Sequence, residues 1–426
     1  MASKQQVIVV GAGPSGCLLA LRLIRQGIRV ILIEQEVEIQ PHFRALGYPG
    51  CTHSALEKAG IWEEATNTGF IKRGFSWRKL PRNHTTDTNV KEWGDLIVTW
   101  DPYADFPHDG KAGHGMLALP QNKFREIILP KLLASDLTKV FLGHTVVQLC
   151  QDSTSTTVTM VDSTGIEAQV TGSFLVGADG GKSVIRKQLG LHLDGFTWDH
   201  IVVAVDMLID LPPPSDGPSS FYYVDPIDFA FFSVIEKPPK SGPILWRCTL
   251  AMTEDESRPE AFDTTLKRKL EKLTPGPKPL QYQLLRAQPY RLHQRSCKTM
   301  KEGRCLLVGD AAHLTNPWGG LGLTTGILDV DSLADALGYV INDGMSESVL
   351  QAWSDARLDV FNNIVSPIAS QNFRRCYEVD PETPFVDPFF RMLHEGSYEL
   401  NSVNQSLYQM VTDVRHLVSL DEACQC

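Results

Sequence analysis

Hydrophobic and polar positions change abruptly at the start of the chain. Residues 7–10 are all apolar, glycines follow at once, and a leucine-rich stretch, residues 18–23, leads to Gly27. Another apolar run, residues 30–33, comes next and ends in Glu34. Short, fully apolar runs are typical of buried parallel strands. This order therefore predicts a strand, a helix that ends at Gly27, and a second parallel strand.

The same pattern returns twice further along the chain. Residues 174–176 and 305–308 are apolar runs that lead into a glycine and an aspartate, and a helical stretch follows each of them. Buried strands that alternate with helices predict an α/β fold with a Rossmann-like domain.

A different pattern occupies residues 193–283. Apolar and polar side chains alternate there, as in antiparallel strands, and proline clusters separate the runs. The strands predicted in this part cover residues 201–209, 220–224, 230–235 and 244–252. Other predictions are a helix over 54–65, a helical stretch from 119 to 132, an antiparallel hairpin of 140–150 with 156–161, and C-terminal helices interrupted at Pro367.

These patterns divide the chain into three predicted parts. The Rossmann-like, nucleotide-binding domain is discontinuous and comprises residues 1–75, 108–192 and 284–350. Residues 76–107 and 193–283 form an inserted β-rich domain that binds the substrate. Residues 351–426 form a C-terminal helical segment, for which we expect packing, closure of the pocket or a homodimer contact.

Composition narrows the class of partner. The formal net charge is −10 and no block of lysine or arginine stands out, which argues against nucleic acid or an anionic membrane. No apolar run approaches the ~18 residues of a membrane span, and the first strand leaves no room for a signal peptide, so we expect a cytoplasmic protein. The nine cysteines are scattered without metal-type spacing, which predicts reduced thiols and no metal site.

The first strand ends in a glycine fingerprint, Gly11-x-Gly13-Pro14-Ser15-Gly16. Backbone N–H groups of such a turn approach a pyrophosphate, and the helix N-terminus favours its charge. An acidic residue about twenty positions later, here Glu34, accepts hydrogen bonds from a ribose. Strand, glycines, helix, strand and acid together predict a nucleotide cradle rather than a turn in an α/β core.

Two aspartates stand where later strands leave the sheet. Asp179 and Asp310 are placed to face a ligand, because ligands bind beyond the carboxyl ends of parallel strands; the alternative for Asp179 is an N-cap of the next helix. Three separated strand-end sites suit a long cofactor such as FAD. The sequence has no second glycine fingerprint, so NAD(P)H is expected to bind transiently.

The sequence resembles the single-component FAD-dependent aromatic hydroxylases of the p-hydroxybenzoate hydroxylase type, the group A flavin monooxygenases. The resemblance rests on the glycine fingerprint with Glu34, on Gly177-Ala178-Asp179-Gly180, and on Gly309-Asp310-Ala311-Ala312-His313 with Pro317. It covers roughly residues 5 to 340. The sequence of one loop looks like that of fungal natural-product members of the family; it is Gly319-Gly320-Leu321-Gly322-Leu323-Thr324-Thr325-Gly326.

The resemblance implies roles for individual residues. Glu34, followed by Gln35, would bind the adenosine ribose, Arg44 and Gln121 would lie along FAD, and Asp310 would hold the ribityl chain. Asp179 would touch the pyrophosphate side and affect reduction by NAD(P)H. Pro317 would sit beside the reactive flavin face, with Gly320 in the same loop. Gly322 and Leu323 would offer N–H groups to the pyrimidine edge. For Arg44, spacing alone leaves a surface arginine equally open.

Two positions depart from the commonest family pattern. Thr324 replaces an asparagine at the start of the last helix and is expected to cap it, and Trp318 is expected to place its indole near the flavin. The substrate type therefore stays open.

The activity implied is a monooxygenase reaction. NAD(P)H reduces FAD, O₂ adds at flavin C4a, and the hydroperoxide hydroxylates a small phenolic or polyketide-like aromatic molecule of secondary metabolism. A phenolate reacts faster than a phenol, so a base or a cation is expected near the hydroxyl, with Tyr222, Tyr223 and Arg247 as candidates. Aromatic residues in this region line a pocket or form core. Alternatives are Baeyer–Villiger insertion, epoxidation or ring rearrangement, and a non-redox escort of prenylated GTPases.

Overall fold

The computed structural model describes residues 5–38, 47–87, 89–396 and 405–418. Its first layer is a six-stranded sheet in the order β10-β2-β1-β14-β22-β21. The apolar runs form its parallel centre, and Gly11 and Asp179 follow the carboxyl ends of adjacent strands. The strands are β1 (Gln6–Val10), β2 (Arg29–Glu34), β10 (Thr138–Leu142), β14 (Phe174–Gly177), β21 (Lys301–Glu302) and β22 (Cys305–Leu307).

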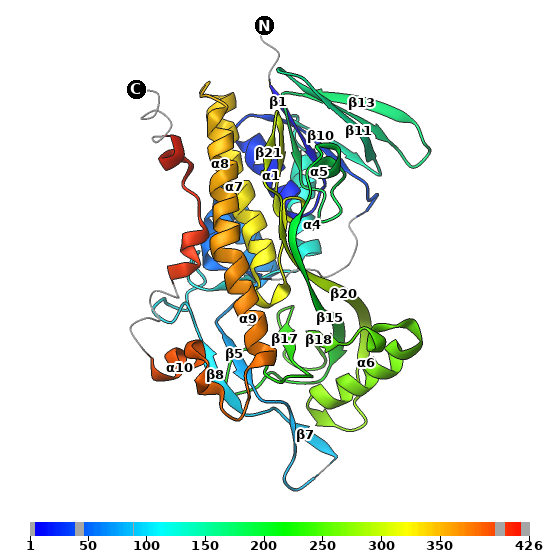
Figure 1. Ribbon diagram of the computed structural model, residues 1–426, viewed down its shortest axis with the longest axis vertical. Coiled ribbons are helices and arrows are strands. Elements are labelled where there is room, and N and C mark those ends of the chain that lie inside the picture. Colours follow the sequence, from blue (N-terminus) through cyan, green and yellow to red (C-terminus); the bar gives the residue numbers. More distant parts are fainter. Residues whose placement is uncertain (1–4, 39–46, 88, 397–404, 419–426) are drawn as a thin grey trace.

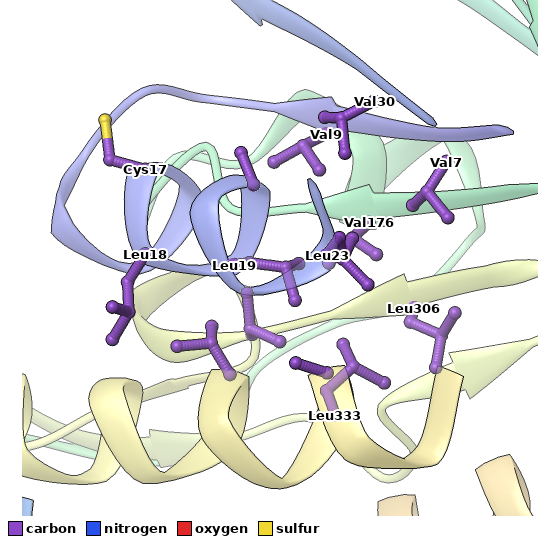
Figure 2. Close-up of a cluster of buried hydrophobic side chains, with 14 of the residues drawn as sticks. Val7, Val9, Cys17, Leu18, Leu19, Leu23, Val30, Val176, Leu306 and Leu333 are labelled. Carbon is purple, nitrogen blue, oxygen red and sulfur yellow. The ribbon is translucent and has the colours of Figure 1, made fainter. Parts of the chain in front are cut away.

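Helices bury the apolar strands of this sheet. Helix α1 (Pro14–Arg25) packs against α4 (Gln121–Leu133) and α7 (Leu321–Ile341). Figure 2 shows side chains of α1 and α7, among them Leu19 and Leu333, meeting those of the strands in one cluster. The strands and the helix faces that pack on them are apolar. This packing fixes the edge of the sheet that carries the glycine loop.

The second layer is an eight-stranded sheet in the order β23-β20-β15-β18-β17-β16-β5-β8. The two longest strands, β15 and β20, run from the neighbourhood of the first sheet into the second (Figure 1). The strands are β5 (Phe75–Arg78), β8 (Leu96–Trp100), β15 (Asp194–Ile209), β16 (Ser220–Tyr223), β17 (Ala230–Val234), β18 (Ile244–Met252), β20 (Gln283–Ser296) and β23 (His313–Leu314).

The two faces of this sheet have different environments. Helix α6 (Pro259–Leu273) covers one face, where Leu266 and Leu270 join Phe221, Tyr223 and Trp246 in a buried cluster. The opposite face looks toward the first sheet and the C-terminal helices. A ligand can therefore reach the eight-stranded sheet only on the face opposite α6.

Smaller elements complete the described part. Three-stranded sheets are formed by β11 (Thr145–Gln151), β12 (Thr156–Val161) and β13 (Glu167–Gly172), by β3 (Gly47–Tyr48), β9 (Met116–Ala118) and β4 (Phe70–Lys72), and by β19 (Gly276–Pro277), β7 (Val90–Glu92) and β6 (Arg82–Asn83). Short helices are α2 (His53–Lys58), α3 (Trp62–Thr68) and α5 (Val184–Gln188), with 3₁₀ turns η1 (Gly50–Thr52), η2 (Asp255–Ser257), η3 (Gly309–Ala311), η4 (Pro317–Gly319), η6 (Pro384–Val386) and η7 (Tyr408–Met410).

The C-terminal helices form one long rod followed by a short helix. Helix α8 (Ser348–Val360) continues through a π turn, η5 (Phe361–Val365), into α9 (Ser366–Glu378), and Figure 1 shows them end to end. Helix α10 (Pro388–Glu395) packs near β8. The predicted interruption at Pro367 is wrong: this proline, which lacks an N–H, lies in the first turn of α9 after the wider π turn.

Other predicted boundaries also change. The helix expected over 54–65 is two helices separated at Gly60, whose φ is +63°. The hairpin expected over 140–161 divides at Gly143, because β10 joins the parallel sheet while β11 pairs with β12. Helix α6 (Pro259–Leu273) was not predicted from the sequence pattern. Strand β20 pairs with β15, so residues 284–296 extend the eight-stranded sheet rather than the nucleotide-binding sheet.

The described residues include seven cysteines, all free thiols, six of them buried. No helix among them is long and apolar enough to cross a membrane. They also hold no group of three or more histidine, cysteine or carboxylate side chains suited to a metal ion.

Candidate active site

A cavity of about 1160 Å³ joins the two sheets. It is larger than the roughly 300–1,000 Å³ of a small-molecule site, so it has room for a cofactor together with a substrate. The cavity begins at the glycine loop and at Gln121, the first residue of α4, and passes between Pro317 and the face of the eight-stranded sheet. It ends against α9 and α10.

Close backbone approach explains two of the three fingerprint glycines. A Cβ atom on Gly11 would lie 2.4 Å from the Ala178 carbonyl oxygen, and one on Gly16 would lie 1.9 Å from the Gly11 carbonyl oxygen. Gly11 also has a φ of +101°. A Cβ on Gly13 would meet nothing within 4 Å, and Gly13, Pro14 and Ser15 line the cavity. The loop is a cradle that a dinucleotide fits.

Glu34 is buried beside this loop. Its Oε2 accepts a hydrogen bond from Ala12 N at 2.6 Å, and its Oε1 accepts one from Glu36 N at 2.9 Å. The carboxylate therefore fixes the loop, and it keeps lone pairs on the cavity side for a ribose hydroxyl. Gln35 lines the same wall. The predicted contact of Arg44 lies outside the described residues.

Ser183, and not Asp179, is the N-cap residue of α5, but the Asp179 carboxylate also accepts from the start of this helix. Its Oδ2 accepts hydrogen bonds from Val184 N at 2.7 Å and Ile185 N at 3.2 Å at the start of α5. Its Oδ1 is buried without a hydrogen-bond partner among the described residues, and the residue lines the cavity. An unsatisfied buried acceptor at a dinucleotide cradle fits the N–H or O–H donors of a bound ligand.

A buried ion network stands behind Asp310. Asp329 on α7 accepts hydrogen bonds from Gly309 N (3.0 Å), His313 Nε2 (2.8 Å) and Arg357 Nε (2.7 Å). Burial alone would raise the pKa of Asp329, but the His313 and Arg357 side chains lower it to about 2. The network fixes the turn that directs Asp310 into the cavity.

Arg357 extends this network to the last described segment. Its Nη1 donates to the Met410 carbonyl oxygen at 2.6 Å and to Thr412 Oγ1 at 3.1 Å, and its side chain is fully buried. The sequence indicates no role for Asp329, His313 or Arg357, because their partners lie 16 to 28 residues away along the chain.

Replacing Asp310 with alanine should weaken FAD retention. A ribityl hydroxyl would lose a charged acceptor, a loss of about 1.5–3 kcal/mol, or roughly 10–150-fold in affinity. Titration of the apoprotein with FAD measures the change. Asp310→Asn keeps one acceptor and should lose less. Equal FAD affinity in wild type and D310A would remove Asp310 from the cofactor site.

The loop before α7 presents N–H groups to the cavity. Asn316 Oδ1 accepts from Trp318 N at 3.0 Å, Gly320 turns the chain with a φ of +64°, and no described side chain caps α7. Thr324 Oγ1 instead donates to the Gly320 carbonyl oxygen at 3.2 Å, so the expected capping role is wrong. The first-turn N–H groups, including those of Gly322 and Leu323, are thus left for a ligand.

Pro317 and Trp318 point in opposite directions. Pro317 is exposed to the cavity, whereas the Trp318 indole is buried against Phe229 and Phe373. The expectation of an indole near the flavin is therefore wrong. The turn of η4 directs the proline ring, and not the tryptophan, to the ligand side.

Strand alternation separates the two tyrosines of β16. Tyr222 faces the cavity, stacks on Trp77 at 5.5 Å and donates its hydroxyl to the Trp318 carbonyl oxygen at 3.0 Å. Tyr223 faces α6, in the buried cluster with Phe232. The structure thus contradicts a place for Tyr223 at the substrate. Burial raises the pKa of Tyr222, which makes this hydroxyl a donor and ring wall rather than a base.

Arg247 faces the cavity, but its charge is compensated. Its Nε and Nη2 donate to the two carboxylate oxygens of buried Asp206 at 2.7 and 2.9 Å. The sequence did not indicate several further cavity residues, among them Lys72, Thr249, Tyr290, Asn372, Arg375 and Phe389. Thr249 carries the clearest missed signal, because it stands two positions after Arg247 on the same strand and so shares its face.

The fold and site define a dinucleotide-binding protein whose eight-stranded sheet lines the same cavity as the glycine loop. The chain belongs to the family whose model is described as an FAD binding domain, and the match covers residues 4–367. The residues at the cradle, at Asp310 and at the start of α7 fit FAD.

Individual relatives are aromatic-compound monooxygenases. The chain is 34% identical over 383 residues to a para-nitrophenol 4-monooxygenase of Pseudomonas sp. strain WBC-3, covering 89% of each protein. It is 32% identical to a 6-hydroxy-3-succinoylpyridine 3-monooxygenase of Pseudomonas putida, covering 89% of this chain and 91% of that one. A crystal structure of p-nitrophenol 4-monooxygenase from Pseudomonas putida DLL-E4 is similar with a TM-score of 0.83 and 31% identity, over 96% and 99% of the chains.

Proposed function

We propose that this protein is an FAD-dependent monooxygenase that uses NAD(P)H and O₂ to hydroxylate a phenolic ring. The observation that carries the proposal is one continuous cavity in which the dinucleotide cradle, the Pro317 loop and an aromatic sheet face follow one another. The relatives named above support the same class of reaction.

Bound FAD supplies the redox chemistry, taking electrons from NAD(P)H and activating O₂. The chain's own residues would orient the substrate and stabilise charge on the flavin ring. The free N–H groups of Gly322 and Leu323 and the α7 dipole would stabilise negative charge on the pyrimidine edge of the ring. Phe231 and Tyr222 form a wall that positions an aromatic substrate and excludes water.

The substrate itself is proposed more broadly. The relatives' names contain a nitrophenol and a hydroxypyridine, both small polar aromatic rings. The resemblance to fungal natural-product enzymes points to a larger aromatic molecule, and the cavity beside α9 offers room for one. Cytoplasmic location and a homodimer stay predictions from the sequence.

Anaerobic reduction and product analysis test the function together. We expect purified protein to contain FAD, NADPH or NADH to bleach it faster when a suitable phenol is present, and ¹⁸O from ¹⁸O₂ to enter the product. Bleaching without any labelled product from a panel of phenols would contradict hydroxylation. A protein that binds no FAD would instead favour the non-redox escort alternative.

Replacing Asp179 with asparagine should slow reduction by NAD(P)H. Asparagine keeps one oxygen that can accept from Val184 N, but it removes the charge at the cradle. Asp179→Ala would in addition remove the acceptor of two first-turn N–H groups and destabilise α5 by about 1 kcal/mol, while Ser183 still caps the helix. Stopped-flow reduction rates of D179N at saturating FAD measure the effect, and a rate equal to wild type would contradict it.

A further inference from the structure

Helix α9 presents one of its faces to the cavity. The cavity-lining residues of this helix recur at helical spacing; they are Ile368, Gln371, Asn372 and Arg375. A Cβ atom on Gly319 would lie only 3.1 Å from the Ala369 Cα atom, so the first turn of α9 is seated against the Pro317 loop. At ~1.5 Å per residue, Arg375 lies roughly 9 Å further along the helix. The family match ends at residue 367, so this wall comes from the part of the chain that follows it.

Two hydrogen bonds hold the Arg375 side chain and leave one of its nitrogens unused. Its Nε donates to Asp387 Oδ1 at 3.0 Å, and its Nη1 donates to Asn372 Oδ1 at 2.7 Å. Neither Arg375 Nη2 nor Asn372 Nδ2 has a hydrogen-bond partner among the described residues, although the arginine side chain is only 8% exposed. Both residues line the cavity. Two N–H donors therefore remain for a ligand that binds there.

Asp387 compensates the charge of Arg375 less completely than Asp206 compensates that of Arg247. Arg247 donates from Nε and Nη2 to both carboxylate oxygens of Asp206. Arg375 makes a single hydrogen bond to Asp387, and the same Oδ1 also accepts from Phe390 N at 2.9 Å. Because charge-assisted hydrogen bonds are the strong ones, the unused guanidinium nitrogen favours an anionic oxygen over a neutral one.

Aromatic rings adjoin this donor pair in the cavity. The Arg375 guanidinium lies 4.3 Å from the centroid of the Phe389 ring, and Phe389 contacts Trp100 with ring centroids 5.9 Å apart. Phe75 contacts both Trp100 and Tyr222, with centroid distances of 6.5 and 6.2 Å. All four rings line the cavity. An aromatic ligand packed against them would have Arg375 at its edge.

Resting on the proposed function, we propose that Arg375 and Asn372 bind the phenolate oxygen of the substrate and select the anion for reaction. The substrate ring would lie against the aromatic side chains named above, and its oxygen would accept from Arg375 Nη2 and Asn372 Nδ2. The phenolate binds from solution, where it is in equilibrium with the phenol, so no protein base is required. The cation that the sequence led us to expect near the hydroxyl is then Arg375, rather than Arg247.

The ionisation of a bound coloured phenol tests this contact in the FAD-loaded enzyme. The probe is 4-nitrophenol, because its phenol and phenolate absorb at different wavelengths, and difference spectra against the ligand-free enzyme give their ratio in the bound state. Arg375→Met should lower the ratio of bound phenolate to bound phenol at a fixed pH about tenfold or more, since a neighbouring opposite charge lowers the pKa of an acid by about 1–3. For a phenol without a visible band, the pH dependence of Kd, read from the flavin spectrum, gives the same ratio.

A matched ligand and a matched variant control the experiment. 4-Nitroanisole has the same ring but cannot ionise, so wild type and R375M should bind it alike. Arg374→Met removes the adjacent arginine, which is exposed and lies 3.9 Å from Glu378, and it should leave the ionisation of 4-nitrophenol unchanged. An unchanged ratio in R375M, or an equal loss of affinity for both ligands, would overturn the phenolate site even though the enzyme binds phenols.

Two further outcomes are decisive. If wild type neither binds nor hydroxylates any phenol, the proposed function itself fails. Should R375M not retain FAD, Asp387→Asn carries the test. Asparagine can still accept from Phe390 N, but it removes the counter-charge of Arg375. The ratio of bound phenolate to bound phenol should then rise, and an unchanged or lower ratio would overturn the proposal.

Discussion

Asp329→Asn is expected to lower the free energy of unfolding by about 3–5 kcal/mol, the usual cost of leaving a buried charge without its partner. Asparagine has nearly the same shape, but Arg357 would then keep its charge at full burial. Urea unfolding of the apoprotein and of the FAD complex measures the loss, and the transition midpoint should fall in both. FAD affinity should fall as well, because Gly309 N loses the acceptor that fixes the Asp310 turn.

The same carboxylate predicts an acid limit to stability. The pKa of Asp329 is lowered to about 2 in the folded protein, against ~3.9 in an unfolded chain. A depressed pKa stabilises the fold above the unfolded value, and this contribution is lost as pH falls from about 4 toward 2. The variant should lack that part of the acid dependence.

Asp335→Asn is the matched control on the same helix. Asp335 pairs with Lys58 and Arg22, but its side chain is 33% exposed, so its removal should cost only about 0–1 kcal/mol. If both substitutions lowered the free energy of unfolding equally, the buried Asp329 network would contribute no more to stability than a half-exposed ion pair.

Gly16→Ala is expected to abolish most FAD binding. The new Cβ would lie 1.9 Å from the Gly11 carbonyl oxygen, a backbone atom that cannot move without displacing the cradle from β14. Overpacking of this kind costs about 1–3 kcal/mol, which corresponds to roughly 5–150-fold in affinity. Flavin content after purification and titration of the apoprotein with FAD measure the effect.

Gly13→Ala should weaken FAD binding without disturbing the packing of the glycine loop, so it separates the two effects. A Cβ at Gly13 meets no protein atom within 4 Å and enters the cavity, so this variant should keep wild-type stability in the apoprotein and still bind FAD less well. A G16A protein with full flavin content would contradict the close approach between Gly11 and Gly16.

Sequence patterns predicted the strands and the cofactor, and they failed where contacts are long-range. The apolar runs predicted β1, β2, β14 and β22, because a buried strand needs no distant information. Alternation along β16 would have separated Tyr222 from Tyr223 if the covered face had been known, and that face depends on α6. The direction of the Trp318 indole depends on Asn316 and on the turn at Gly320, which spacing does not encode.

Lys72 shows the limit most clearly. Its partners Ser220 and Ser233 lie 148 and 161 residues away along the chain. Nothing in the short segment around β4 distinguishes a buried lysine from a surface one. The burial of Lys72 follows only from the contact between β4 and the eight-stranded sheet.

The contact between Arg357 and the Met410 carbonyl oxygen makes the last described segment a thermodynamic partner of the cofactor. Asp329 joins Arg357 to Gly309, and Gly309 precedes the aspartate that faces the cavity. Coupling free energies are reciprocal. If the docked segment 405–418 raises the affinity for FAD, bound FAD must stabilise the docked segment by the same free energy. Proteolysis near the C-terminus should therefore slow on addition of FAD, and clipping there should release flavin.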